Sequence, residues 1–130
     1  MYSVAVKQHF IAQHYLVGGD WGAENLRHSH HYVVEALLEG PELDRHDYLV
    51  DIVAVEGALS ELADYYRDRT LNDLPGMAGH NPSLELLAAA ICRALVARLR
   101  RPNLAAISVK VWESDSAWAG YRLPLAAAQG

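Results

Sequence analysis

The chain has 130 residues, 52% of them hydrophobic, which suits a single domain spanning residues 1–130 with one core. Its formal net charge of -5 and its lack of a basic stripe argue against nucleic acid or an anionic membrane as a partner, because nothing would neutralise phosphate. The single cysteine excludes an intrachain disulfide, and no apolar run reaches the roughly 20 residues that span a bilayer. Because the start of the sequence also lacks a secretory signal pattern, we expect a cytoplasmic protein.

The first 50 residues contain runs in which apolar and polar residues alternate, a pattern typical of strands. It predicts a first strand from Tyr2 to Leu16, followed by a glycine-rich loop over Gly18–Gly22. A second strand is predicted over His28–Glu39 and ends at Gly40-Pro41. Tyr48–Val50 reads as a short extended run after it.

Helical spacing of apolar residues replaces the alternation in the middle of the chain. Asp51 is placed to cap a first helix, and Asn81 followed by Pro82 predicts the N-cap and first position of a second. The apolar residues at helical spacing are Ile52, Val55, Leu59, Leu62 and Tyr66 in the first helix and Leu84, Leu87, Ala88, Ile91, Leu95 and Leu99 in the second.

Two further strands are predicted near the end of the sequence, over Ala105–Trp112 and Tyr121–Leu125. The predicted order is therefore strand, strand, helix, helix, strand, strand. Because strands and helices are grouped, we expect an α+β domain: a four-stranded antiparallel sheet with two helices on one face.

Three histidines are the most informative residues. His28 and His30 are two positions apart in a predicted strand, so both side chains point to the same side, with their Cα atoms about 7 Å apart. His14 lies on the apolar register of the preceding strand, which can place it beside them. Three histidines with an open fourth position form the ligand set of a catalytic zinc site, so we expect Zn²⁺ as cofactor. An isolated His-x-His would instead indicate a structural or surface pair.

Six short segments follow one another in a distinctive order. They are Phe10-Ile11-Ala12-Gln13-His14, His28-Ser29-His30-His31-Tyr32, Tyr48-Leu49-Val50-Asp51-Ile52, Leu71-Asn72-Asp73-Leu74-Pro75-Gly76, Asn81-Pro82-Ser83-Leu84-Glu85 and Val111-Trp112-Glu113-Ser114. Each segment alone is a weak signal. Together, over nearly the whole chain, they resemble the 6-pyruvoyl-tetrahydropterin synthase and 6-carboxytetrahydropterin synthase family, as a diverged member.

This resemblance implies the tunnelling fold (T-fold), in which strands of several subunits close a barrel, as trimers or as hexamers of two stacked trimers. It implies a small-molecule pterin substrate and zinc held by His14, His28 and His30. It also implies that Glu113 anchors the pterin ring, with Ser114 beside it in the substrate site. The alternative for Glu113 is a surface carboxylate at a strand end.

The chain departs from the family pattern at its proton-transfer residues. Glu24 stands where the family usually has a cysteine, four residues before the first histidine of His-x-His. Arg67 and Asp68 stand where the family has an Asp-His pair; an alignment shifted by one places Asp68 on the Asp and Arg69 on the His. Arginine stays charged near neutral pH and cannot shuttle protons. Asp68 and Glu24 therefore remain as the catalytic candidates.

Two functions follow from these departures. The first is a zinc-dependent lyase acting on a dihydropterin side chain, including retro-aldol cleavage of 7,8-dihydroneopterin with release of glycolaldehyde, for which Glu24 is the candidate base. The resemblance implies this retro-aldol route for relatives that carry glutamate at the cysteine position. The second is a catalytically altered homologue that binds pterin and keeps the fold and metal site. The alternative for Glu24 itself is a solvated loop carboxylate.

Other polar residues receive structural predictions. Glu85 lies near a helix N-terminus, where the helix dipole favours a carboxylate. His31 points away from His28 and His30 and is not expected to bind the metal. Cys92, within the second helix, is expected to be a small buried apolar group.

Overall fold

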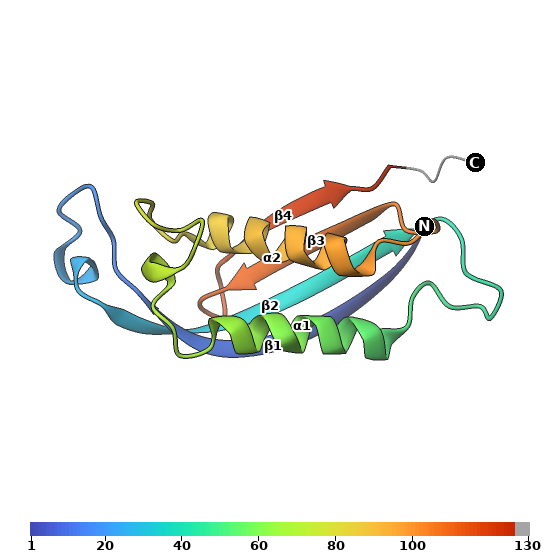
Figure 1. Cartoon of the computed structure of the whole chain (residues 1–130), viewed down its shortest axis with the longest axis horizontal. Helices are drawn as coiled ribbons and strands as arrows, with labels where there is room; N and C mark the ends of the chain where they lie inside the picture. The colour runs from blue at the N-terminus through green and yellow to red at the C-terminus, as the bar shows by residue number, and fades with distance from the viewer. Residues whose placement is uncertain (127–130) are drawn as a thin grey trace.

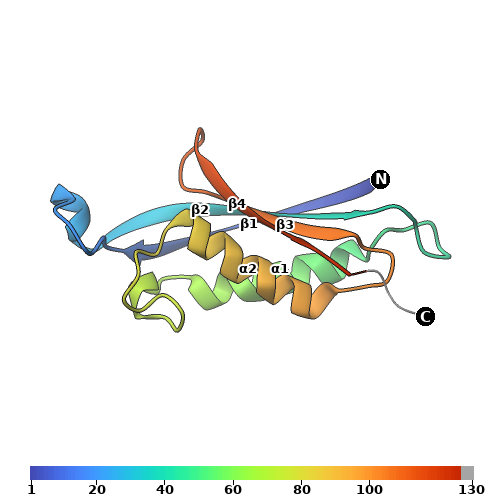
Figure 2. The ribbon, with the colours of Figure 1, turned by 90° about the horizontal axis from the view of Figure 1, so that it is seen from above.

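The computed structural model describes residues 1–126 and forms one four-stranded antiparallel sheet with two helices on one face (Figures 1 and 2). The strands lie in the order β1, β2, β3, β4, which confirms the predicted fold class. The last four residues of the predicted domain lie outside the described residues. The elements are β1 (Tyr2–His14), η1 (Gly22–Asn25), β2 (His28–Gly40), α1 (Ile52–Tyr66), η2 (Leu71–Asp73), α2 (Leu84–Leu99), β3 (Ala106–Trp112) and β4 (Trp118–Pro124).

Strand pairing sets where the strands end, and it corrects one predicted bound each of β1 and β4. β1 ends at His14 instead of Leu16, because His14 pairs with His28, the first residue of β2. β4 begins at Trp118 instead of Tyr121, since Trp118 pairs with Trp112 at the end of β3. The run Tyr48–Val50 forms no strand; its backbone lies in the loop before α1.

Side-chain caps fix the starts of the two helices. The Asp51 carboxylate accepts a hydrogen bond from the Val53 N–H at 3.0 Å, which confirms the predicted cap of α1. The predicted cap of α2 is wrong: Ser83 is the N-cap, and its hydroxyl accepts from the Leu86 N–H at 3.2 Å. The Asn81 side chain instead accepts a hydrogen bond from the backbone N–H of Val17 at 2.7 Å. This bond joins the loop after β1 to the start of α2.

The core lies between the sheet and the helices, because alternate residues of each strand face the helices. Phe10 of β1 and Tyr32 of β2 are at most 1% exposed, and the Phe10 ring lies between the rings of Tyr32 and Tyr66 of α1, with centroid distances of 5.4 and 5.7 Å. Each large apolar side chain buried in this way contributes about 1.5–3 kcal/mol. Among residues 1–126, no helix is long and apolar enough to cross a membrane.

The opposite face of the sheet is covered by no helix of the described chain (Figure 2). It carries an ion pair between Lys7 and Glu35 at 3.8 Å and a contact between ring nitrogens of His9 and His31 at 3.1 Å. His31 thus lies on the face away from His28 and His30, as the strand alternation predicted.

Candidate metal centre and pterin site

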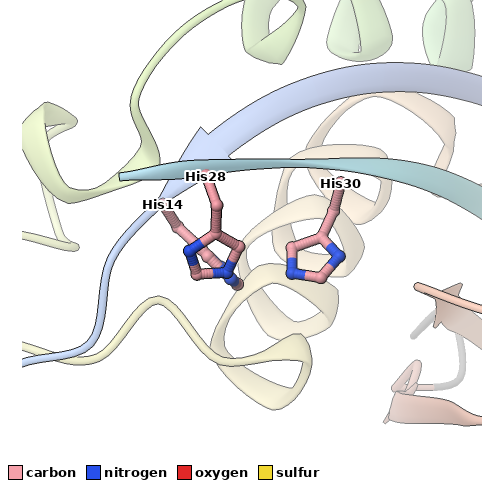
Figure 3. A group of neighbouring side chains, drawn as sticks. All are labelled: His14, His28 and His30. Atoms are coloured by element: carbon pink, nitrogen blue, oxygen red, sulfur yellow. The ribbon is translucent and has the colours of Figure 1, made fainter. Parts of the chain in front are cut away.

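The three histidines converge at one end of the sheet, on the face that carries the helices (Figure 3). His14 and His28 are paired neighbours on β1 and β2, and His30 follows two residues later on β2. The ring centroids lie 4.5 Å apart for His14 and His28, 4.6 Å for His14 and His30, and 4.9 Å for His28 and His30. One nitrogen from each ring lies within 4.8 Å of the other two, so the group can hold a metal ion.

A hydrogen bond leaves one ring nitrogen of His28 free to bind a metal ion. Nδ1 of His28 lies 2.8 Å from the carbonyl oxygen of Leu26, and because a carbonyl only accepts, this nitrogen carries the proton. The lone pair of His28 is then on Nε2, which is buried and has no hydrogen-bond partner in the described chain. A buried ring nitrogen with an unused lone pair beside two other imidazoles fits a borderline divalent cation such as zinc.

The pKa of His14 is lowered from 6.5 to about 4, first by burial and then by His30 and His28. The Pro82 backbone and the negative charge of Glu24 oppose this shift only in part. His14 is therefore neutral at pH 7, and neutral imidazole is the form that binds metals. Its Nδ1 lies 3.1 Å from the hydroxyl of Tyr32, a buried contact within the same group of side chains.

A cavity of about 330 Å³ opens beside His14 and His30 and extends to the start of α2. Three carboxylates line it: Glu24 from η1, Glu85 from the first turn of α2, and Glu113 just after β3. The structure thus brings Glu24 and Glu113 to the histidines from segments far apart in the sequence. A larger cavity of about 420 Å³ lies at the other end of the molecule, before α1, and contains none of these residues.

Two predicted site residues lie outside this cavity. Asp68 follows α1 with a positive φ of 59°, and its N–H donates to the Ile11 carbonyl at 2.7 Å along β1, at the edge of the sheet. Ser114 lines a separate hollow of about 230 Å³ with Lys7 and Trp112, whose side chains belong to the uncovered sheet face. Cys92 is fully buried, and its thiol donates to the Ile107 carbonyl at 3.3 Å.

Sequence reasoning missed two residues that the structure places at the site. Tyr32 continues the two-residue register of His28 and His30, and this spacing is the signal that could have placed it beside the three histidines. The sequence predicts a structural role for Glu85 at a helix start. Glu85 does lie in the first turn of α2, but its carboxylate also lines the cavity. The sequence alone does not reveal this second role, because it depends on how α2 packs against the end of the sheet.

Comparisons with known proteins agree with this architecture. Residues 3–124 match the family model described as 6-pyruvoyl tetrahydropterin synthase. The fold is similar to the 6-pyruvoyl tetrahydropterin synthase of Plasmodium vivax, with a TM-score of 0.81 and 15% identity over 95% of this chain and 98% of that one. The Caenorhabditis elegans synthase gives a TM-score of 0.78 and 20% identity over 92% and 94% of the two chains.

A variant of the P. vivax synthase in which a catalytic glutamate is replaced by alanine is also similar, with a TM-score of 0.80 and 16% identity over 95% of this chain and 98% of that one. At these identities the structural likeness shows a shared fold. No curated protein matches this chain in sequence.

Proposed function

The chain belongs to the 6-pyruvoyl tetrahydropterin synthase family, and on that premise we propose that it is a zinc-dependent lyase acting on the side chain of a dihydropterin. The observation that carries this proposal is the meeting of three histidines with Glu24 and Glu113 at one cavity. Metal ligands, a candidate base and a candidate anchor for the ring are the parts that such a reaction needs.

His14, His28 and His30 would hold the metal ion. A divalent zinc ion on three neutral imidazoles supplies Lewis-acid polarisation to a hydroxyl oxygen of the substrate. The chain prepares this site by keeping His14 neutral and by fixing the proton of His28 on Nδ1 through the Leu26 carbonyl. Ligand orientation by such a second hydrogen bond is typical of metal-binding histidines.

Glu24 is the proposed general base. It lines the same cavity as His14 and His30, and a catalytic glutamate also occurs in the P. vivax synthase. Glu113 is the proposed anchor of the pterin ring, because a carboxylate can accept two N–H groups from the amino edge of the ring. Ser114 remains a proposed substrate residue and Asp68 a proposed catalytic one. Each would need a second copy of the chain, or a movement, to reach this cavity.

Retro-aldol cleavage is the reaction that these residues fit best. Glu24 removes the proton from the second hydroxyl of the dihydroneopterin side chain, and a carbonyl forms at that carbon. The bond between the first and second side-chain carbons breaks, so that glycolaldehyde leaves. The electron pair on the first carbon is delocalised into the pterin ring, and protonation of that carbon gives 6-hydroxymethyl-7,8-dihydropterin. Only one base is needed, so the loss of the family's Asp-His pair matters less than in the pyruvoyl-forming elimination.

The test is turnover of 7,8-dihydroneopterin by the zinc-loaded protein, with products identified by mass. We expect glycolaldehyde and the hydroxymethyl product from the wild type. Glu24→Gln should lower the rate by about 10²–10⁴-fold, with zinc content and pterin binding retained. Glu56→Gln is the matched control, because this exposed glutamate of α1 changes the net charge equally and does not line the cavity. Unchanged cleavage by Glu24→Gln would remove Glu24 from the mechanism.

A second candidate function is pterin binding without turnover. It is favoured by Asp68, which stands in the segment of the family's Asp-His pair but lies at the β1 edge, outside the cavity. Zinc-loaded wild type that binds dihydropterins and cleaves none of them would support this function over the lyase.

Assembly into trimers or hexamers is proposed from the family. The backbone supports it, because β1 and β4 are the edge strands of the sheet and an exposed edge can pair with another copy. Sedimentation at micromolar concentration tests this, and a monomer would refute it.

A further inference from the structure

Two histidines on the uncovered face of the sheet contact each other, away from the three-histidine cluster of His14, His28 and His30. Nδ1 of His9, on β1, lies 3.1 Å from Nε2 of His31, on β2. We infer that the His9–His31 pair is a second metal site, which takes one divalent late transition ion such as Cu²⁺ or Zn²⁺. This inference is independent of the proposed function, because neither residue lines the cavity of the three-histidine cluster.

Antiparallel pairing of β1 and β2 holds the two side chains together. His9 lies opposite Val33 in the register of the two strands. His31 lies opposite Ile11, so the two histidines are diagonal neighbours on one face of the sheet. Because successive residues of a strand point to opposite faces, His31 is directed away from the face on which His30 lies. The sheet therefore separates the two sites, and each would hold its own ion.

The distance between the two nitrogens matches that between two ligands of one ion. With metal–nitrogen bonds of about 2.0–2.1 Å, two imidazole nitrogens on one ion are about 2.9 Å apart at a right angle and about 3.3 Å apart at a tetrahedral angle. The observed 3.1 Å lies between these values. The ring planes of the pair meet at 77°, close to the 71–77° found among the rings of the three-histidine cluster.

Binding of an ion to the pair needs only a change of tautomer. One of the two facing nitrogens carries the proton of the hydrogen bond between the rings, and the other accepts it. An ion would take the place of this proton, which moves to the second nitrogen of the same ring, so that both lone pairs face the ion. His9 and His31 are both solvent-exposed, so an ion can enter from water.

The surroundings of the pair favour an ion that prefers nitrogen ligands. Lys7, two residues before His9 on the same face, is paired with the Glu35 carboxylate at 3.8 Å. Within residues 1–126, no cysteine, carboxylate or further histidine joins the pair in a three-ligand group, so water would fill the other coordination positions. Imidazole suits Cu²⁺, Ni²⁺ and Zn²⁺, whereas Mg²⁺ and Ca²⁺ prefer oxygen. With two protein ligands, we expect this site to bind zinc more weakly than the three-histidine cluster.

Equilibrium dialysis of the full chain against rising free Zn²⁺ tests the inference. We expect two ions per chain, one bound tightly and one weakly. His9→Gln/His31→Gln should lose the weak ion and retain the tight one, which also shows that the variant is folded. Each single substitution should weaken the second site about 100-fold, because two linked ligands bind far more tightly than either alone. His46→Gln/His80→Gln removes two other exposed histidines and, as the matched control, should bind both ions.

The variant His28→Ala/His30→Ala separates the two metal sites. At raised free zinc it should lose the tight ion and keep the weak one, and an excess of Mg²⁺ should not release that ion. If the wild type binds one ion and His9→Gln/His31→Gln binds none, the three-histidine proposal fails and the second site stands. Equal zinc binding by the wild type and His9→Gln/His31→Gln, or release of the weak ion by Mg²⁺, would overturn the inference.

Discussion

Replacing Tyr32 by phenylalanine tests how the metal centre is built, because this change removes one hydroxyl and keeps the buried ring. The hydroxyl lies 3.1 Å from Nδ1 of His14, and the two residues are 1% and 7% exposed. Water therefore has little access to replace the lost partner. A buried hydrogen bond of this kind contributes about 0.5–1.5 kcal/mol, and an unpaired polar group costs about 1–3 kcal/mol.

The effect on metal affinity depends on how much more the hydrogen bond between Tyr32 and His14 stabilises the metal-bound protein than the metal-free protein. If His14 binds the ion through Nε2, its Nδ1 must carry the proton and donate to the Tyr32 oxygen. The positive ion makes that N–H a stronger donor, so the hydrogen bond is worth more in the metal-bound state. Loss of an outer partner of a metal-binding histidine typically costs 10–100-fold in affinity. For this single neutral partner we expect about tenfold, or about 1.4 kcal/mol.

The assay is zinc competition with a chromophoric chelator at pH 7.5, for the wild type and for Tyr32→Phe. Tyr66→Phe is the matched control, because it removes the hydroxyl of another buried tyrosine, one that stacks on Phe10 in the core. Urea unfolding of the metal-free proteins separates lost stability from lost affinity. Equal zinc affinity in Tyr32→Phe and the wild type would refute the assignment of Tyr32 as a positioning residue for His14.

Three further predictions address the metal ligands, the core and the loop before α1. The double variant His28→Ala/His30→Ala should lose bound zinc, and equal zinc by elemental analysis in variant and wild type would exclude the proposed ligands. Phe10→Ala should lower the free energy of unfolding by about 3–5 kcal/mol in urea, because Phe10 has no exposed surface. Two backbone N–H groups, those of His46 and Tyr48, hold the pKa of the half-buried Asp44 below its usual 3.8. The ionised Asp44 carboxylate therefore stabilises the folded protein above pH 3.8, and this stabilisation is lost as pH falls through the lowered pKa. The melting-temperature gap between wild type and Asp44→Asn should therefore close in acid, and a constant gap from pH 7 to pH 3 would contradict this.

The fold class could be predicted because its signals are local. Alternation of apolar and polar residues indicates a strand, and apolar residues three or four positions apart indicate a helix. Because the predicted strands and helices are grouped along the chain, they favour one arrangement, a sheet with both helices on one face. The histidine cluster could be predicted for the same reason. His28 and His30 share a strand face by spacing alone, and His14 joins them through the antiparallel register with β2.

The rest of the site depends on contacts between distant segments, which a local pattern does not contain. Asn81 resembles a helix cap in sequence, but its side chain bonds to Val17, 64 residues away. That contact moves the cap to Ser83 and brings the first turn of α2, with Glu85, to the end of the sheet. In the same way, the position of Ser114 on the other side follows from how the chain turns between β3 and β4.

The placement of the acidic residues divides the proposed chemistry into steps that one chain can perform and steps that it cannot. Glu24 and Glu113 lie at the cavity of their own chain, beside the histidines. Asp68 is held along the edge of β1 by the hydrogen bond to Ile11, and an edge strand is where another copy can approach. A step that needs Asp68 therefore requires a second copy of the chain or a movement, whereas the proposed proton removal by Glu24 does not. The proposed retro-aldol route uses only the residues of one cavity, and for this reason we propose it over a reaction with several proton relays.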